Sequence, residues 1–181
     1  ASPESVLHQF ASQFARLLIV RGEFERAREL LVEASELMQR FVGERTPDYA
    51  STLIGHGELA LATGDPSSAR AALAEAEGIF SETLGEGHPY TLVGRMKRVA
   101  ALPAGERTEA LAEVVGELEQ AGPVARAFLA EGRCEQAVGA IERGQSELAQ
   151  ARAEQCLTLR RELSLGGWRE IEAEALLALA G

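Results

Sequence analysis

Residues 64–69, Gly-Asp-Pro-Ser-Ser-Ala, carry the pattern that decides the fold: a glycine is followed five residues later by an alanine. The same pair occurs three more times, at Gly22/Ala27, Gly105/Ala110 and Gly144/Ala149. The spacing between successive glycines is nearly constant (64−22 = 42, 105−64 = 41 and 144−105 = 39). A repeat of this length, with one small residue at a turn and another inside the following helix, is typical of helical hairpins that stack in a row. The sequence therefore predicts an all-α solenoid and argues against catalysis.

The residues around these glycines predict where the hairpins begin and end. Downstream of Gly22, apolar side chains recur with helical spacing, at Ala27, Leu30, Leu31, Ala34, Leu37, Met38 and Phe41. Helix starts are predicted where proline follows a capping residue, at Thr46-Pro47 and Asp65-Pro66. Helix ends are predicted at Pro103, Gly122-Pro123 and Gly166-Gly167. We expect a single domain over residues 1–181, with four antiparallel hairpins at about 3–42, 46–84, 89–121 and 123–164 and a C-terminal capping helix at 168–180.

The charge of the chain excludes several classes of partner. Aspartate and glutamate number 28 against 18 lysines and arginines, for a formal net charge of −10. Nucleic acids and anionic membranes select a basic surface, so we expect neither as a partner. No apolar run approaches the ~20 residues of a membrane span, and no signal peptide is recognised.

Residue usage indicates the source of the chain. Arginine is plentiful, Lys97 is the single lysine and asparagine is absent, a bias typical of a G+C-rich genome, and we expect a bacterial protein. The chain begins at Ala1 without a methionine, which suggests a piece of a longer polypeptide, although a mature secreted protein would begin in the same way. Cys134 and Cys156 form no metal-binding motif, so we expect no metal, two reduced buried thiols and a cytoplasmic location.

The repeat pattern resembles the tetratricopeptide repeat family. In that family a glycine between the two helices is followed by an alanine, by an aromatic residue or leucine four positions on, and by another alanine three positions later. The first two repeats match this pattern, with Gly22, Ala27, Leu31 and Ala34 and with Gly64, Ala69, Leu73 and Ala76. The last two depart from it, with Gly105, Ala110, Val114 and Glu117 and with Gly144, Ala149, Ala153 and Cys156. The resemblance implies a right-handed solenoid in which the alanines mark the points where two helices cross.

The length of the repeat points to one type within this family. The common repeat has about 34 residues, whereas the kinesin-light-chain type and its bacterial relatives have longer repeats joined by a turn of the form L-G-x-x-H-P-x-T. Residues 84–91 read Leu-Gly-Glu-Gly-His-Pro-Tyr-Thr and fill every defined position of that turn. The resemblance covers nearly the whole chain, most closely over residues 1–91, and it gives His88 a helix-capping role.

Catalytic chemistry finds little support in the sequence. His8, His56 and His88 are the only histidines, and we expect His56 to have a packing role within or beside its hairpin. No serine or cysteine lies in a nucleophile-elbow context, and no glycine-rich phosphate loop occurs. The glutamates are interleaved with arginines at helical spacing, as on a solvated face. We therefore expect no enzyme activity and no cofactor, and an enzyme that uses Glu/His chemistry is the alternative that a deep polar pocket would support.

The resemblance also implies a binding surface, because the first helices of tetratricopeptide hairpins line a concave groove that takes a partner segment. The groove positions correspond here to Gln9, Gln13, Arg16, Ser51, Ile54, Glu58, Leu92, Arg95, Met96, Val99, Glu131 and Glu135. Family members that clamp a carboxyl terminus use lysines and asparagines in this groove, so such clamping is not expected here. The mixed lining suits an amphipathic protein segment with charges of both signs. Alternatively, Leu92 and Met96 pack within their own hairpin.

Three functional hypotheses follow. The first is a non-catalytic protein-interaction scaffold within a larger bacterial protein. The second is a peptide- or ligand-sensing regulatory part of a signalling protein, such as a kinase or a transcription regulator. The enzyme is the third. A homodimer through the terminal helices is also possible, since the last helix carries Leu176, Leu177 and Leu179.

Overall fold

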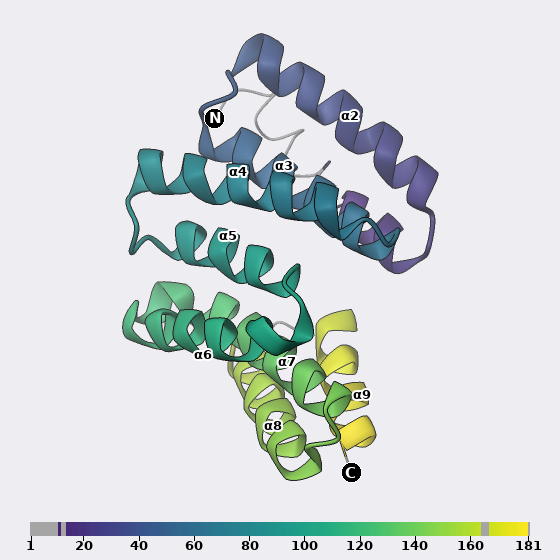
Figure 1. Ribbon diagram of the computed structural model, residues 1–181, viewed down its shortest axis with the longest axis vertical. Helices are drawn as coiled ribbons and strands as arrows, with labels where there is room; N and C mark the ends of the chain where they lie inside the picture. Colours follow the sequence, from purple (N-terminus) through teal and green to yellow (C-terminus); the bar gives the residue numbers. More distant parts are fainter. Residues whose placement is uncertain (1–10, 12–13, 164–166, 181) are drawn as a thin grey trace. The chain divides into compact units, whose positions relative to one another are not determined.

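The structure is a computed structural model, which describes residue 11, residues 14–163 and residues 167–180 (Figure 1). Within these residues the regular structure is entirely helical, so the prediction of an all-α chain is confirmed. Backbone contacts divide the chain into two units, Ala1–Leu102 and Pro103–Gly181. Each unit is an array of helices joined by short turns.

In the first unit, residues 14–20 are helical and four complete helices follow. These are α2 (Phe24–Phe41), α3 (Pro47–Ala62), α4 (Pro66–Leu84) and α5 (Pro89–Ala100). Consecutive helices pack against each other, and α3 also contacts α5, so α3 lies among three neighbours (Figure 1). The core between α2, α3 and α4 contains Met38, Tyr49, Leu53, Ile79 and Phe80.

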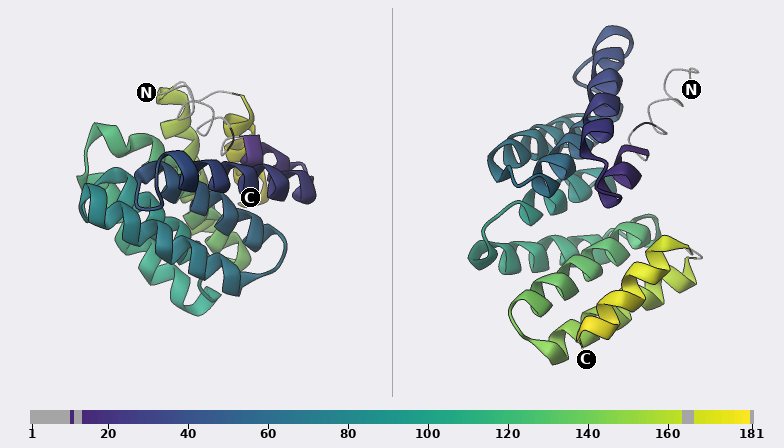
Figure 2. Two further views of the ribbon diagram at one scale, coloured as in Figure 1. Left: turned by 90° about the horizontal axis from the view of Figure 1, so that it is seen from above. Right: turned by 90° about the vertical axis from the view of Figure 1, so that its right-hand side faces the viewer.

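In the second unit, a 3-10 turn and four helices follow the same plan. The elements are α6 (Ala104–Gln120), η1 (Pro123–Ala125), α7 (Arg126–Glu142), α8 (Ser146–Glu162) and α9 (Trp168–Ala180). Helix α7 contacts α6, α8 and α9, and α9 also packs on α8 (Figure 2). Helix α9 therefore covers one side of the α7–α8 hairpin.

Three of the four predicted turn glycines form the same turn. Gly22, Gly64 and Gly144 have positive φ angles of 74°, 78° and 66°, a conformation that glycine adopts without a side-chain penalty. In the second of these turns, the Asp65 amide donates to the Ala60 carbonyl at 2.8 Å, and the other two turns repeat this bond at 2.9 Å. This bond is the 6→1 contact of a Schellman motif, which satisfies carbonyls at the end of a helix.

Gly105 departs from this pattern. Helix α6 begins at Ala104, so Gly105 lies in its first turn and Pro103 is the N-cap residue. The Ala101 and Leu102 amides close the preceding helix with bonds to the Arg98 and Val99 carbonyls, at 3.1 and 3.0 Å. The interpretation of Gly105 as the turn residue of a third identical hairpin is therefore wrong, because a proline-capped start replaces the left-handed glycine turn.

The alanines five residues after the predicted turn glycines show the same division, because the one after Gly105 is less buried than the other three. Ala27, Ala69 and Ala149 are completely buried, as expected for side chains at the point where two helices meet. Ala110, which follows Gly105, is only partly buried. Small side chains at a crossing let the helices approach, and larger ones would overpack the contact.

Side chains cap several of the helices that begin with proline. Thr46 Oγ1 accepts a hydrogen bond from the Tyr49 amide at 3.3 Å, and Asp65 Oδ1 accepts one from Ser68 at 3.0 Å. At the start of α5, His88 Nδ1 accepts a bond from the Tyr90 amide at 3.2 Å. The predicted capping role of His88 is confirmed. Each cap satisfies an amide that the helix itself leaves without a partner.

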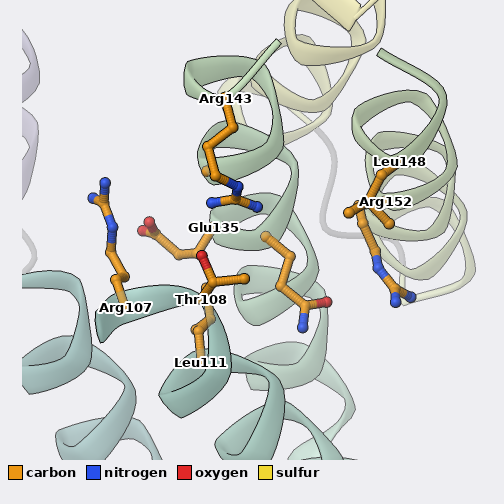
Figure 3. Close-up of a pocket in the computed structure, with 9 residues that line it drawn as sticks. Arg107, Thr108, Leu111, Glu135, Arg143, Leu148 and Arg152 are labelled. Carbon is orange, nitrogen blue, oxygen red and sulfur yellow. The ribbon is translucent and has the colours of Figure 1, made fainter. Parts of the chain in front are cut away.

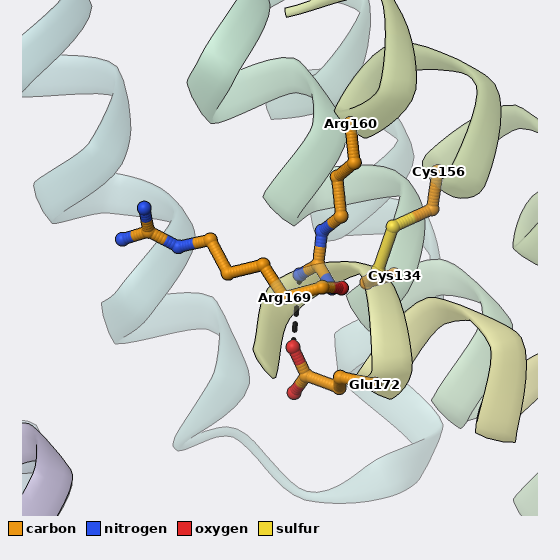
Figure 4. Close-up of a disulfide and its surroundings, with 5 residues drawn as sticks. All are labelled: Cys134, Cys156, Arg160, Arg169 and Glu172. Carbon is orange, nitrogen blue, oxygen red and sulfur yellow. Dashed lines mark hydrogen bonds and ion pairs between the residues drawn. A yellow bond between two sulfur atoms is a disulfide. The ribbon is translucent and has the colours of Figure 1, made fainter. Parts of the chain in front are cut away.

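The two cysteines form a disulfide between α7 and α8, with their Cα atoms 5.4 Å apart (Figure 4). The prediction of two reduced thiols is therefore wrong. Cys134 lies ten residues before Gly144 and Cys156 twelve residues after it, so the turn folds the two positions against each other. The sequence separation of 22 residues matches no recognised motif, and only the antiparallel packing of the hairpin reveals the pair.

Helix α9 is attached to the disulfide region by a buried arginine. The Arg160 side chain, from α8, donates to the Arg169 carbonyl and forms an ion pair with Glu172 at 2.9 Å (Figure 4). Ala173, Leu176 and Leu177 pack beside the disulfide. Both contacts lie at the start and middle of α9, which holds this helix along the hairpin.

Candidate functional site

The residues predicted to bind a partner fall into three groups. Gln9 and Gln13, together with His8, lie outside the described residues. In the first unit the structure places Arg16 on the helix at 14–20, Ser51, Ile54 and Glu58 on α3, and Leu92, Arg95, Met96 and Val99 on α5. Glu131 and Glu135 lie on α7 in the second unit. The helices at 14–20, α3 and α5 carry the candidate site in the first unit, and we call their shared surface the first-helix face.

A chain of ion pairs crosses the first-helix face. Glu58 Oε2 lies 3.0 Å from Arg16 Nε, and Glu58 Oε1 lies 2.8 Å from Lys97 Nζ. The Glu58 side chain is 15% exposed and that of Lys97 is 10% exposed, so this carboxylate and ammonium meet largely away from water. Removing one partner of such a buried pair leaves an uncompensated charge, which makes the network a strong structural link between three helices.

The repeat period explains why these side chains meet. The spacing from Arg16 to Glu58 (58−16 = 42) equals the spacing from Pro47 to Pro89, which begin α3 and α5 (89−47 = 42). Residues one period apart occupy equivalent positions on neighbouring hairpins and therefore lie side by side. Opposite charges at that spacing were a sequence signal for this contact.

Lys97 is absent from the predicted site because the prediction aligned the third repeat on Gly105. That alignment assigns Leu92, Arg95, Met96 and Val99 to the groove, each displaced from its α3 counterpart by the same offset (92−51 = 41). The full period instead makes Lys97 the equivalent of Gly55 (97−55 = 42). Since Gly105 is not a turn glycine, the longer spacing is the correct one for α5, and it brings Lys97 into the site.

Three of the predicted contact residues on α5 lie in the core. Leu92, Met96 and Val99 are 1%, 0% and 3% exposed. This burial favours the alternative interpretation, in which these apolar side chains pack within their own array. A partner that leaves the helices in place has no access to them.

Arg95 is half-buried and turned toward α4. Its Nε atom lies 3.1 Å from Glu77 Oε1, and its Nη2 atom lies 2.8 Å from Glu86 Oε2. Arg98 donates to the other oxygen of Glu77. These contacts hold Arg95 against the preceding hairpin, so a partner would reach it only at its edge.

Ser51 and Ile54 are both partly buried on α3. The Ser51 hydroxyl donates to the Pro47 carbonyl at 3.0 Å, which satisfies it within its own helix. Ile54 packs against two apolar clusters, one containing Phe80 and the other Leu73. The accessible part of the first-helix face therefore combines the edges of an apolar side chain and a hydroxyl with the charges around Glu58.

Glu131 and Glu135 are partly buried on α7. Cys134 lies between them in sequence and is bonded to Cys156, so this stretch of α7 is held by the disulfide.

His56 has a structural hydrogen bond. Its Nε2 atom lies 2.8 Å from Ser35 Oγ, which links α3 to α2. Burial lowers the pKa of His56 from its usual value of 6.5, while a hydrogen bond involving the Leu31 backbone acts in the opposite direction. The neutral imidazole is thus favoured, and this contact agrees with the packing role predicted for this residue.

Neither a metal-binding cluster nor a membrane-spanning helix is found among the described residues. No group of three or more His, Cys, Asp or Glu side chains with a metal-binding arrangement occurs among them. Within the same residues, no helix has both the length and the apolar character needed to cross a bilayer.

Comparison with known proteins agrees with this architecture. Residues 7–82 match the tetratricopeptide repeat family model. The TPR-like repeats of a putative kinesin light chain from Podosopora anserina are 20% identical in sequence, with 99% of this chain and 87% of that chain covered and a TM-score of 0.64. A variant form of those repeats with a single substitution has the same identity and coverage and a TM-score of 0.63. No curated protein matches the chain. At this identity, the structural likeness shows the fold: a solenoid of antiparallel helical hairpins.

Proposed function

The chain belongs, over residues 7–82, to the tetratricopeptide repeat family, and from this premise we propose that it is a non-catalytic scaffold that binds a segment of another protein. The first-helix face is the binding surface in this proposal. The observation that carries it is the Arg16–Glu58–Lys97 network, which connects three successive first helices on the face where the family resemblance implies a partner.

The chemistry of this face indicates the kind of segment that fits. Ile54 supplies an apolar edge, and beside it the guanidinium of Arg16, whose side chain is 31% exposed, is the most accessible charge of a network in which Glu58 and Lys97 are largely buried. An amphipathic segment matches such a surface when its apolar side chains cover Ile54 and its charged side chains, of both signs, pair at the rim. Rim charges mainly set specificity and the association rate, so the proposed interaction depends on ionic strength.

Site-specific crosslinking tests the proposal. A photo-crosslinkable residue at Ser51, on the first-helix face, is expected to capture a partner in native lysate, and unlabelled protein is expected to compete with that capture. Arg16→Glu reverses the charge beside Glu58 and should reduce the capture about tenfold, since it leaves two carboxylates facing each other. The matched control is Arg28→Glu on α2, an arginine whose side chain is 52% exposed and whose ion pair joins neighbouring turns of one helix.

Two results of this crosslinking experiment would contradict the proposal. Capture that is equal from Ser51 and from a crosslinker at Glu29, on the outer face of α2, would contradict a localised binding face. Capture at Ser51 that survives Arg16→Glu, with an unchanged helical circular dichroism spectrum, would contradict the role of the charge network.

The location of the protein is part of the proposal. Disulfides persist in oxidising compartments and are rare in the cytosol. The bond between Cys134 and Cys156 therefore favours an oxidising compartment over the cytoplasm expected from composition. Labelling of free thiols in protein taken directly from its source, before any oxidation, tests this: protein from the cytosol should label at both positions, and protein from an oxidising compartment at neither.

A further inference from the structure

The second unit contains a cavity of about 60 Å³ between α6, α7 and α8 (Figure 3). Its polar lining comprises Arg107 and Thr108 from α6, Glu135 and Gln136 from α7, Arg143 directly after α7, and Arg152 from α8. Three cations and one carboxylate line this space, and one of the cations, Arg107, is paired with Glu142, so the net formal charge is +1 (3−2). The whole chain has a formal charge of −10, so the cavity gathers positive charge against the trend of the protein.

Arg107 has a buried donor that lacks an acceptor. Its Nη2 atom is bonded to Glu142 Oε2 at 2.5 Å, but its Nε–H is buried and has no hydrogen-bond partner in the described part of the chain. A buried unsatisfied donor is costly, and few occur in folded proteins. An acceptor in the cavity beside Arg107 would satisfy it.

Neither Arg143 nor Arg152 forms an ion pair with a carboxylate among the described residues. The Arg143 Nε–H donates to Gln145 Oε1 at 3.0 Å, and the Arg152 Nη1–H donates to Gln155 Oε1 at 2.8 Å. Both acceptors are neutral amide oxygens. Each guanidinium carries five N–H donors, so most of the donors on these two side chains remain available to an anion.

A glycine makes room for Arg143. Figure 3 shows the Arg143 side chain running along α7 toward the middle of the cavity lining. A Cβ atom at Gly139 would lie only 3.2 Å from Arg143 Nη1. The missing side chain at Gly139, one turn earlier on α7, lets the guanidinium lie close to the helix surface beside the cavity.

The size of the cavity limits the ligand. A site of this kind needs roughly 10–15 Å³ for each water molecule, so a volume of about 60 Å³ corresponds to about four water-sized groups. A tetrahedral oxyanion presents four oxygen atoms, and guanidinium groups bind such oxygens with paired, charge-assisted hydrogen bonds.

We propose that this cavity is a binding site for a phosphate-type tetrahedral oxyanion, held by Arg107, Arg143 and Arg152. The Arg107 Nε–H supplies a buried donor, Arg143 supplies a guanidinium from the end of α7, and Arg152 adds positive charge from α8. The site lies between two second helices and one first helix of the hairpins in the second unit, and it shares no residue with the first-helix face.

Titration of the whole chain with inorganic phosphate tests the proposal, with sodium chloride at equal ionic strength as the reference. Phosphate is expected to raise the thermal midpoint above that reference, and isothermal titration should give one site. Arg143→Met should weaken phosphate binding by about tenfold or more, the effect of losing a charge-assisted hydrogen bond. Arg126→Met, at an arginine of α7 that lies outside this cavity and pairs with Glu162, should leave the affinity unchanged.

Gly139→Ala gives a second test that separates binding from folding. Alanine favours a helix interior over glycine, yet the added methyl group would displace Arg143. This variant should keep or raise the thermal midpoint without phosphate and should bind phosphate several-fold more weakly.

The source of the oxyanion is distinguished by comparing inorganic phosphate with O-phosphoserine. Tighter binding of inorganic phosphate identifies the free ion as the ligand, and tighter binding of O-phosphoserine identifies a phosphorylated side chain. The proposal is overturned if phosphate stabilises the protein no more than chloride does, which would leave only water in the cavity. It is also overturned if Arg143→Met and Arg126→Met bind phosphate equally well.

Discussion

The α3–α4 hairpin of the first unit and the α7–α8 hairpin of the second share one backbone plan and differ in what joins their helices. Both turn at a glycine in the left-handed conformation, and both bury the alanine five residues later. Positions can therefore be compared by counting from Gly64 in one hairpin and from Gly144 in the other. The glycine turn therefore sets the geometry of the hairpin, and different types of side chain can join its two helices.

The first contrast is in the size of the side chains that pack where the two helices cross. In α3–α4, Leu73 packs directly against Gly57, where a Cβ atom would lie 2.5 Å from Leu73 Cγ. The equivalent positions of α7–α8 hold Ala153 and Ala137, both fully buried. The α3–α4 hairpin thus pairs a leucine with a glycine where its helices cross, and the α7–α8 hairpin pairs two alanines at the same point.

The second contrast is in the type of interaction that holds the helices together. Phe80 is buried in the first hairpin, and its equivalent in the second is Arg160, which is also buried and is bonded to α9. The positions of Ile54 and Ala76 correspond to Cys134 and Cys156. The alanine-rich hairpin buries smaller apolar side chains and has a covalent link where its counterpart has an apolar contact.

Exchanging the crossing residues tests the packing contrast and should give the largest effect. Leu73→Ala is expected to cost about 2–5 kcal/mol because it leaves a cavity, and Gly57→Ala about 1–3 kcal/mol because it overpacks. The double variant reproduces the Ala137/Ala153 arrangement, so it should be more stable than Leu73→Ala alone. Urea unfolding of the four proteins measures the coupling between the two positions.

The mirror exchange in α7–α8 is the control. Ala153→Leu should destabilise, and adding Ala137→Gly should recover part of the loss. If the changes in unfolding free energy of the single variants simply add in the double variants of both hairpins, the Leu/Gly pair and the Ala/Ala pair are not alternative ways to fill the same helix crossing.

Removing the disulfide tests the bonding contrast. A loop closed over a sequence separation of 22 residues is expected to contribute about 3 kcal/mol, since the bond restricts the unfolded chain. Cys134→Ala with Cys156→Ala should lower the urea midpoint accordingly, and a reductant should lower the midpoint of the unsubstituted protein to a similar degree. Reductant should have no effect on the double variant. An unsubstituted protein that is insensitive to reductant would contradict the role of the bond.

The start of the first helix differs between the hairpins and should give a smaller effect. Helix α3 has a capping hydroxyl at Thr46, whereas the N-cap residue of α7 is Ala125, which offers no side-chain cap. Thr46→Ala should cost about 1 kcal/mol, and Thr46→Ser should cost much less because serine retains the capping oxygen. Thermal unfolding measures both. Equal losses in the two variants would assign the effect to packing of the methyl group instead.

The smallest effect is expected from His56, whose equivalent in α7 is Gln136. Burial lowers the pKa of His56 below 6.5, so the folded state favours the neutral ring. The resulting stability is fully present above pH 6.5 and is lost as the pH falls through the lowered pKa. Urea midpoints at a series of pH values should therefore fall less steeply below pH 6.5 for His56→Gln. Identical pH profiles for the two proteins would show that His56 contributes no such linkage.

Much of the fold was predictable because its signals are local. The glycines at 22, 64 and 144, the buried alanines after them and the capping role of His88 follow from residues within a few positions of each other. The third repeat shows where this reasoning failed. Gly105 keeps the spacing but lies inside α6, so the groove positions assigned on α5 were displaced by one residue and Lys97 was missed.

The sequence alone determined that this chain is a series of α-helical hairpins, because turns, caps and apolar stripes act over a single helix. Only the tertiary structure decided which other distant side chains meet: Glu58 with Lys97, Cys134 with Cys156, and the arginines around the cavity. The physical reason is that these contacts depend on the rotation and register of one helix against another. A shift of one residue turns a helix by about 100° and moves a side chain from a shared surface into the core.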